Sequence, residues 1–330
     1  MPSPELFFDT MFGPQRTAAL KAAIDLEVFT IIGDGARTIA EIADRCGASE
    51  RGIRILCDNL TIMGFLTKTG DAYALTVDST VFLSTRSPAY VGSAVEFLYS
   101  LETIESLDRL TETVRSGTVV PAANTVSDDN PIWVKFARGM GPLMVPAANA
   151  IADVLEVDAA GPIRVLDIAA GHGMFGIAIA RRNPAAEIVA VDWAPVLAVA
   201  TGNAQARGVG ARHRALNGDA FTVEYGTGFD IALLANFLHH FGPPACVRLL
   251  QKTAAALKPG GRVAILEFVP NDDRVSPPLA AAFSLTMLSA TPNGDAYTLR
   301  EHCGMLMEAG FKDVAVHSLP VLQTIIVASR

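Results

Sequence analysis

Three acidic side chains follow predicted strands in one half of the chain, where they could bind a nucleoside. Asp167 ends one apolar run, Asp192 ends the next, and Asp219 follows a third. Gly171 and Gly173 lie between the first two runs, where glycine allows a tight turn and leaves N–H groups exposed at the start of a helix. Asp192 follows Gly171 by 21 residues, about the spacing at which an acid accepts hydrogen bonds from a ribose diol. The pattern predicts a ligand that contains adenosine.

The glycine-rich stretch is compatible with two kinds of cofactor. Its letters, GHGMFG, satisfy the dinucleotide-binding pattern GxGxxG, so a nicotinamide-dependent reductase is one hypothesis. Asp167 argues against it, because a dinucleotide site usually has an apolar strand that leads straight into the first glycine. An acid at this position suits a positively charged cofactor instead.

Two histidines follow the fourth predicted strand, and a glutamate lies in the fifth. Ligands bind beyond the carboxyl ends of parallel strands, so His239, His240 and Glu267 should face the reactive end of the cofactor. A histidine can take a proton from a phenol or an enol near neutral pH, and a carboxylate can hold its ring in one tautomer. We predict that His239 is the base and that Glu267 orients it, although His240 as the base and a purely structural histidine pair remain alternatives.

A parallel sheet is needed to bring these residues together, and the pattern from residue 161 onward predicts one. Helical patterns near 174–182, 195–206 and 243–257 separate apolar runs near 163–168, 187–191, 213–216, 229–234 and 262–268. A helix at 299–309 precedes two closely spaced strands, 314–318 and 321–328, which predicts a terminal antiparallel hairpin. The fold class is therefore α/β, with a doubly wound, mostly parallel sheet of seven strands.

The first 100 residues predict a mainly helical domain with a small hairpin. Residues 15–29 carry the apolar stripe of one helix, Thr38 and Glu41 form a capping box, and Ser49 caps a further helix. The runs 65–68 and 72–76 flank a short turn, as in a β-hairpin. This order resembles a winged helix, which raises the hypothesis of a DNA-binding regulator.

The distribution of charge argues against a nucleic-acid partner. Residues 1–100 contain 8 basic and 12 acidic side chains, and the whole chain has a net charge of −8. The candidate recognition helix carries Glu50 and Asp58 beside Arg51 and Arg54, a poor surface for displacing counterions from phosphate. We expect the apolar faces of this N-terminal module to pack against a second copy of the chain, which makes a homodimer the predicted assembly.

The composition is typical of a globular protein. Half of the 330 residues are hydrophobic, yet no apolar run approaches the roughly 18 residues that span a bilayer. The first residues lack the features of a secretory signal, so we expect a soluble, cytoplasmic protein with no membrane partner. The 4 cysteines are scattered without metal-binding spacing, which predicts buried free thiols and no metal site.

A segment of predicted helices, residues 101–155, links the two halves of the chain. We expect a long helix over 90–110 and another that begins near Pro131. Trp133, Phe136, Met140 and Met144 share one face of the second helix. That face is either part of the core or the wall of a hydrophobic pocket, since methionine adapts to flat aromatic ligands.

Together these motifs resemble the class I S-adenosylmethionine (SAM)-dependent O-methyltransferases of the plant caffeate and the bacterial hydroxyindole or phenazine type. The likeness runs nearly end to end and includes NGDA at 217–220, LKPGG at 257–261 and FARGM at 136–140. It implies a winged-helix dimerisation domain over 1–100, linking helices over 101–155 and a catalytic domain over 156–330. It also implies methyl transfer from SAM, with S-adenosylhomocysteine as product and without a metal, to a hydroxyl of a small, flat, hydrophobic acceptor. Transfer to carbon or nitrogen on the same scaffold is the alternative.

The resemblance assigns roles to individual residues. The residues implied for the cofactor site are Asp167, Gly171, Gly173, Asp192, Trp193, Gly218, Asp219, Ala220, Phe221 and Asn236. Those expected to line the acceptor pocket are Tyr99, Trp133, Phe136, Met140, Met144, Phe283, Met287 and Leu288. His239 matches the base of the family, and Glu267 matches its first glutamate.

Two positions depart from the pattern of the family. Its second glutamate falls on Ala296, and the acid that usually follows the base is replaced by His240. The acidic environment of the predicted base therefore differs on two counts.

Overall fold

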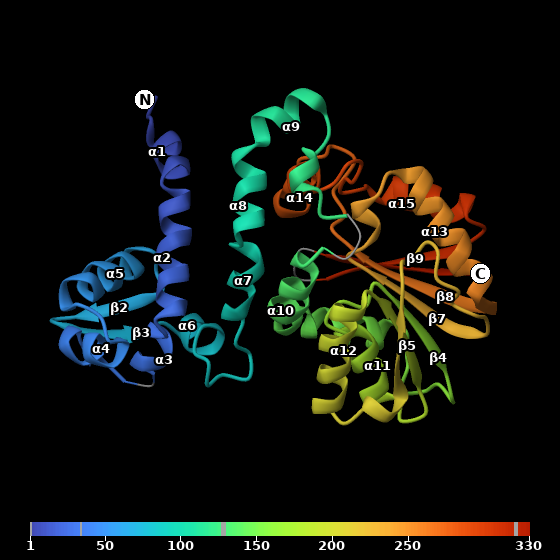
Figure 1. The fold of residues 1–330 in the computed structure, drawn as a ribbon, viewed down its shortest axis with the longest axis horizontal. Helices are drawn as coiled ribbons and strands as arrows, with labels where there is room; N and C mark the ends of the chain where they lie inside the picture. The colour runs from blue at the N-terminus through green and yellow to red at the C-terminus, as the bar shows by residue number, and fades with distance from the viewer. Residues whose placement is uncertain (1, 34, 127–129, 320–322) are drawn as a thin grey trace. The chain divides into compact units, whose positions relative to one another are not determined.

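The computed structural model describes residues 2–33, 35–126, 130–319 and 323–330 (Figure 1). The chain divides into two compact units, Met1–Tyr99 and Ser100–Arg330. The segment expected to link two domains, 101–155, lies in the second unit. In the described part of the chain, no helix is long and apolar enough to cross a membrane.

The first unit consists of short helices around a small antiparallel sheet. Its strands, in the order β1-β3-β2, are β1 (Arg37–Thr38), β2 (Leu66–Thr69) and β3 (Ala72–Leu75). Its helices are α1 (Glu5–Met11), α2 (Gly13–Asp25), α3 (Val28–Ile32), α4 (Ile39–Cys46), α5 (Glu50–Ile62), α6 (Val77–Phe82), the 3-10 turn η1 (Gly92–Ala94) and α7 (Val95–Leu98). Phe29, Ile42 and Tyr73 are among the residues of its buried core.

The local signals in this unit are confirmed. Thr38 accepts a hydrogen bond from the Glu41 N–H, and the Glu41 carboxylate accepts one from the Thr38 N–H at 2.8 Å, so the capping box is complete. Ser49 caps α5 by accepting from the Gly52 N–H. The predicted hairpin is β2 and β3. These features depend on neighbours in the sequence, which is why the pattern found them.

Two of the predicted helices are wrong in extent. The helix expected over 15–29 is interrupted at Glu27, which has a left-handed φ of 53° and separates α2 from α3. The helix expected over 90–110 is broken because Ser100 is extended and caps a new helix, α8 (Leu101–Asp108), by accepting from the Thr103 N–H. The apolar stripes continue across both breaks, so periodicity alone could not locate them.

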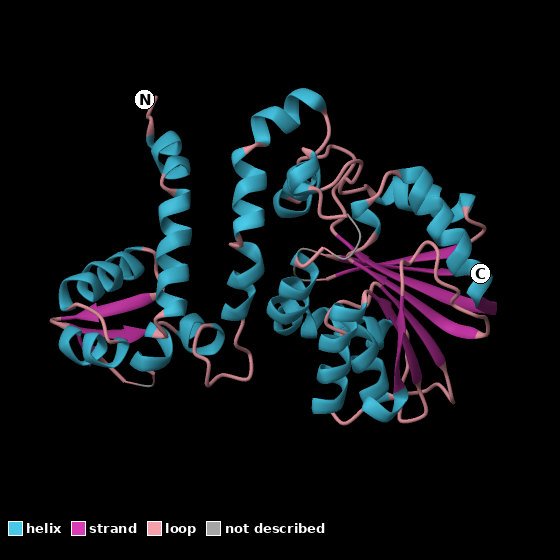
Figure 2. Ribbon diagram, in the orientation of Figure 1, coloured by secondary structure: helices cyan, strands magenta, loops and turns pink. Residues whose placement is uncertain are grey.

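The second unit contains the predicted seven-stranded sheet, in the order β6-β5-β4-β7-β8-β10-β9. Figure 2 shows its strands in magenta and the helices beside them in cyan. Its strands are β4 (Arg164–Ile168), β5 (Glu187–Asp192), β6 (His213–Asn217), β7 (Phe229–Ala235), β8 (Leu257–Glu267), β9 (Lys312–Ser318) and β10 (Thr324–Ser329). The strands from β6 to β8 are parallel, and β10 is antiparallel to both β8 and β9. The predicted fold class is confirmed, with β8 beginning five residues earlier than expected. The start of the last predicted strand, 321–322, lies outside the described residues.

Helices cover both faces of this sheet. Besides α8, the helices and 3-10 turns of this unit are α9 (Leu110–Ser116), the turn η2 (Pro121–Ala123), α10 (Ile132–Val154), α11 (Met174–Arg182), α12 (Ala194–Ala206), η3 (Gly210–Arg212), η4 (Leu238–His240), α13 (Pro243–Ala256), α14 (Pro278–Ala290) and α15 (Leu299–Glu308). Alternate residues of β4 enter different cores: Val165 packs with α10 and α11, whereas Leu166 and Ile168 pack with α13 and α15. Asp167 therefore faces the α10 and α11 side.

Candidate active site

A buried histidine and glutamate form a close pair at the carboxyl ends of β7 and β8. His239 lies in η4, directly after β7, and its Nδ1 is 2.5 Å from Oε2 of Glu267. The other carboxylate oxygen accepts hydrogen bonds from the backbone N–H groups of Phe237 and His239, at 3.1 and 3.3 Å. The two side chains that the sequence predicted to act together are thus in contact.

The pair is arranged to leave one histidine nitrogen free for a substrate. Burial alone would raise the pKa of Glu267, but attraction to the protonated form of the His239 ring and the hydrogen bonds from His239 outweigh burial and hold this pKa below its ordinary value. A carboxylate at Nδ1 selects the tautomer that carries its proton there, so Nε2 presents a lone pair. That is the state a general base requires.

Aromatic rings surround this pair in a continuous chain, which we call the ring cluster. Phe283 of α14 lies edge-on to His239 with ring centroids 4.9 Å apart, and it stacks on Phe268 at 4.0 Å. On the side of His239 away from Phe283, each ring contacts the next in the order His240, Trp133, Phe136 and His172. The ring cluster joins the glycine-rich turn to the histidine–glutamate pair.

His240 differs from its neighbour in having no acidic partner. Burial and the charge of His239 hold its pKa well below the ordinary value, so it is neutral near pH 7. Its Nδ1 is buried and has no hydrogen-bond partner among the described residues. The contrast favours His239 over His240 as a base, because only His239 has a carboxylate to stabilise the protonated ring.

Most of the residues predicted to line the acceptor pocket lie on two helices, α10 and α14. Trp133, Phe136 and Phe283 belong to the ring cluster. Met140 is half-buried on the same helix, and the sulfur of Met144 accepts a hydrogen bond from the Asn236 amide at 3.7 Å. Met287 is buried and Leu288 half-buried on α14, a helix that the sequence did not predict. Tyr99 ends the first unit, so its role stays a prediction.

The glycine-rich turn has the backbone conformation that requires glycine. Gly171 and Gly173 have φ values of 57° and 75°, in the left-handed region, at the start of α11. The Gly171 N–H donates to one oxygen of Asp192 at 2.9 Å, and the Trp193 N–H donates to the other at 2.8 Å. A side chain at Gly173 would come within 3.1 Å of Ala200, so this turn also lets α12 approach closely.

Asp167 and Asp192 form an uncompensated negative site beneath this turn. Asp167 is 1% exposed, and one of its oxygens accepts from the Gly176 N–H at 3.1 Å. Burial raises the pKa of Asp167 to about 7 and that of Asp192 to about 6, and no described cation lowers either. One buried and one half-buried carboxylate without a counter-ion among the described residues fit a cationic ligand such as a sulfonium nucleoside.

Gly176 lets α11 lie close to the carboxylate of Asp167. A Cβ atom there would lie 2.7 Å from Ile188 and 2.9 Å from Asp167 Oδ2, so Gly176→Ala should overpack the core. We expect the free energy of unfolding to fall by about 1–3 kcal/mol in urea denaturation. Gly202→Ala is the control, since nothing lies within 4 Å of its Cβ position in α12, and it should stabilise by up to about 1 kcal/mol. Equal effects of the two substitutions would contradict the close approach.

The stretch after β6 is a tight turn that begins at Gly218. Gly218 has a φ of 150°, and Asp219 accepts from the Phe221 N–H at 2.9 Å. Ala220 is buried, and the Phe221 ring lies edge-on to Phe241. The assignments of these residues to adenine stay predictions.

Three residues near the site were not identified from the sequence. His172 stacks on Phe136 and accepts from the Met174 N–H at 3.1 Å, and burial lowers its pKa to about 4. Phe268 stacks on Phe283, and Gln323 donates to the side-chain oxygen of Asn236. His172 could have been found from its place between two glycines, and Phe268 from its place after Glu267. Gln323 had no such signal, because its partner is 87 residues away.

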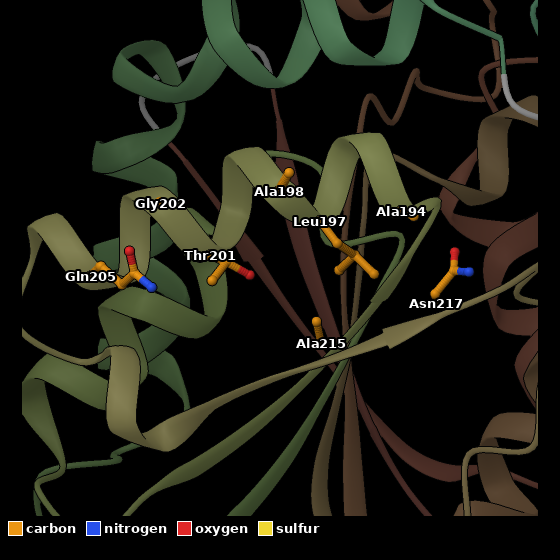
Figure 3. Close-up of a pocket in the computed structure, with 8 residues that line it drawn as sticks. All are labelled: Ala194, Leu197, Ala198, Thr201, Gly202, Gln205, Ala215 and Asn217. Carbon is orange, nitrogen blue, oxygen red and sulfur yellow. The ribbon is translucent and has the colours of Figure 1, made fainter.

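A hollow of about 370 Å³ lies elsewhere on this unit, between α12 and the edge strand β6 (Figure 3). Its lining consists of Ala194, Leu197, Ala198, Thr201, Gly202, Gln205, Ala215 and Asn217. None of the residues predicted to bind the cofactor or the acceptor lines it.

The described residues contain no group of three or more histidine, cysteine or acidic side chains that could hold a metal ion. All 4 cysteines are free thiols. Cys57 and Cys246 are buried as predicted, whereas Cys46 and Cys303 are only half-buried, so the expectation of burial is wrong for that pair.

Comparison with known proteins identifies the family. The model of the O-methyltransferase domain matches residues 117–312, and that of the O-methyltransferase dimerisation domain matches residues 8–85. The chain is 29% identical, over 94% of its length and 90% of the relative's, to 3-hydroxy-5-methyl-1-naphthoate 3-O-methyltransferase of Streptomyces sahachiroi.

Solved structures agree with this assignment. A candidate O-methyltransferase from Nostoc punctiforme is 48% identical and superposes with a TM-score of 0.95 over 100% of both chains. Human N-acetylserotonin methyltransferase, solved in complex with SAM, is 24% identical and shares the fold, with a TM-score of 0.85 over 99% of this chain and 97% of its own. The chain therefore belongs to the O-methyltransferase family, has the class I methyltransferase fold with an N-terminal dimerisation domain, and is a SAM-dependent O-methyltransferase.

Proposed function

We propose that this enzyme methylates a phenolic or enolic hydroxyl of a small, flat, hydrophobic acceptor, with His239 as the general base. The observation that supports the proposal is the 2.5 Å contact between His239 Nδ1 and Glu267 within the ring cluster. His239 Nε2 takes the hydroxyl proton, and Glu267 stabilises the resulting imidazolium. The residues of the ring cluster exclude water and hold a flat acceptor against the base.

SAM would be held by the residues around the glycine-rich turn. We assign the cationic methionine portion to Asp167 and to the turn from Gly171 to Gly173, and the ribose to Asp192. Asp219, Ala220 and Phe221 would contact adenine. When bound, SAM supplies an electrophilic methyl group on sulfur, and the contribution of the chain is to orient an acceptor oxygen toward it.

The acceptor class is inferred from the walls of the site. Trp133, Phe136, Phe268 and Phe283 present flat ring surfaces, and their stacked and edge-on contacts suit a planar molecule. Two relatives are named for hydroxylated aromatic acceptors, the naphthoate enzyme above and mouse acetylserotonin O-methyltransferase, which is 28% identical over 92% of this chain. Both points support an acceptor with fused or substituted aromatic rings.

The test of this proposal is a screen of phenols, naphthols, quinols and enolic oxo-acids for formation of S-adenosylhomocysteine. A hit is then characterised by product mass and by NMR of the transferred methyl group. A methoxy signal supports the proposal, whereas a methyl group on carbon or nitrogen contradicts it. Such an outcome has a precedent in a relative named L-tyrosine C(3)-methyltransferase, which is 26% identical to this chain.

We also propose that the enzyme is a homodimer through its first unit. Large apolar side chains are exposed on α1 and at the junction with α2, namely Leu6, Phe7, Phe8, Met11 and Phe12, each more than half exposed. An apolar patch of this kind typically marks an interface. Its position inside or beside the matched dimerisation domain, 8–85, points to a second copy of the chain.

Charged substitutions in this patch should dissociate the dimer. We expect the double variant Phe8→Lys and Phe12→Lys to elute as a monomer in size-exclusion chromatography with light scattering, because two ammonium groups would have to be buried without partners. Met307→Lys, at a residue 65% exposed in α15, is the matched control and should leave the assembly unchanged. A double variant with the wild-type mass would contradict this interface.

A further inference from the structure

We infer that His302 is a positioning residue for the pair of Glu267 and His239, on which it acts from α15. This inference rests on the proposed function, because His302 would influence the reaction only through His239. Neither the family's base nor its glutamates correspond to this histidine, which comes from the first turns of the last helix.

The fold brings His302 to the same side of the sheet as Glu267. Alternation along β8 puts Glu267 on the face of Ile265, which belongs to the core between the sheet and the helices α13 and α15. On α15, His302 shares its buried face with Met305 and Leu306, and both of these belong to that core.

The loop before α15 fixes the start of this helix against the histidine segment. The Asp295 N–H donates to the His239 carbonyl at 3.0 Å, and the Tyr297 hydroxyl donates to the Phe241 carbonyl at 2.6 Å. A Cβ on Gly294 would come within 2.2 Å of the His239 carbonyl oxygen. His302 in turn packs edge-on against the Tyr297 ring, with centroids 6.0 Å apart. His302 is thus connected to the segment that carries the base.

His302 and Glu267 each have unused hydrogen-bonding capacity. His302 is 1% exposed, and neither of its ring nitrogens has a partner among the described residues. A carboxylate offers about four lone-pair sites, and Glu267 uses three of them, two for backbone N–H groups and one for His239. The two side chains are not hydrogen-bonded to each other in the structure. In the inferred arrangement, an imidazole N–H of His302, turned toward the remaining site, satisfies both groups.

The charges around Glu267 are consistent with a neutral donor. His239, His302, Cys246 and Tyr297 are the titratable groups whose charges interact with that of Glu267. Burial lowers the pKa of His302 more strongly than the nearby carboxylates raise it, so the ring is neutral near pH 7. A neutral N–H donor can hold the Glu267 rotamer and favour its charged form, which keeps the His239 proton on Nδ1.

The absence of the family's second glutamate, at Ala296, explains why the pair would need a further polar group. The family's second glutamate falls on this residue, whose methyl group is fully buried and can neither donate nor accept. His302 follows it in the same loop and helix and supplies the polar group that the substitution removed. In this inference Glu267 is held by two histidines, by His239 through the 2.5 Å contact and by His302 as a donor from α15.

The experiment compares His302→Phe with His302→Gln, both assayed for kcat, KM and the pH profile of kcat. We expect His302→Phe to lower kcat by about 10- to 100-fold with KM nearly unchanged. Loss of the donor makes the pair bind protons more tightly, so the acid limb of the profile should move to higher pH by about half a unit to one unit. His302→Gln keeps an N–H donor and should restore most of kcat and the position of the acid limb.

Several outcomes would overturn the inference. One is a wild-type profile for His302→Phe, and another is a lowered melting temperature without movement of the acid limb, which indicates a structural role. If His302→Phe does not fold, histidine NMR of the wild-type enzyme decides: a His302 ring that becomes protonated between pH 8 and 6 contradicts a neutral donor. His239→Ala is assayed in parallel, because full activity of that variant defeats the proposed function itself, whereas its inactivity beside a normal His302→Phe defeats only this inference.

Discussion

Replacement of His239 by alanine is expected to lower kcat by about 10²- to 10⁴-fold, the range found when a general base is removed. The reason is the buried pair with Glu267, which leaves Nε2 as a proton acceptor and stabilises the charge that the ring acquires. Binding of SAM should change by less than about twofold, because no contact proposed for the cofactor involves this side chain. Steady-state kinetics with an identified acceptor, and calorimetry with SAM alone, provide the two measurements.

Two further variants make this result specific. His317→Ala changes an exposed histidine of β9 and should be as active as the wild-type enzyme. His240→Ala should lose less than His239→Ala, because His240 has no carboxylate to stabilise a protonated ring. Full activity of both His239→Ala and His239→Gln would rule out general-base catalysis, and a greater loss for His240→Ala would transfer the role to that residue.

The parts of this site that the sequence predicted are those determined by short-range chemistry. Asp167, the glycine turn and Asp192 lie within one strand–helix–strand unit, where strand alternation and glycine conformation are local properties. His239 and Glu267 could also be paired in advance, because β7 and β8 were expected to be parallel and their carboxyl ends meet at one edge of the sheet.

Other features depend on packing between segments that are distant in the sequence. The stacking of His172 on Phe136 requires α10 to pack beside the glycine turn. The bond from Gln323 to Asn236 requires the residue before β10 to lie beside the residue after β7, although β8 separates these two strands in the sheet. His302 belongs to the same class, since an apolar helix face containing one histidine gives no sign of what it covers. A single sequence carries the local preferences of each segment but not these contacts.

The affinity for SAM is expected to rise as the pH increases from about 5.5 to 8. Burial raises the pKa of Asp167 to about 7 and that of Asp192 to about 6, so both are partly protonated at the lower end of this range. A cationic ligand favours the carboxylate forms, and its binding should therefore release protons. Calorimetry in buffers of different ionisation enthalpy measures both the affinity and the proton release.

Asp167→Asn separates this effect from other causes of pH dependence. The variant keeps an acceptor for the Gly176 N–H but loses the charge, so SAM should bind more weakly by about 2–4 kcal/mol, roughly 30- to 1,000-fold. Its affinity should also depend less on pH. Asp313→Asn, at an exposed aspartate of β9, should behave like the wild-type enzyme in both respects.

The ligand-free protein should respond to the same substitution in the opposite direction. Because the pKa of Asp167 is higher in the folded state than in the unfolded state, the folded state holds the proton more tightly between about pH 4 and 7. The stability of the ligand-free wild-type protein is therefore reduced as the pH rises through this range, and the loss is complete above about pH 7. Asp167→Asn lacks this loss and should unfold at a higher temperature than the wild-type protein at pH 8. A variant that is less stable than the wild-type protein at pH 8, or one that binds SAM with wild-type affinity, would show that the Asp167 carboxylate supports α11 and does not hold the cofactor.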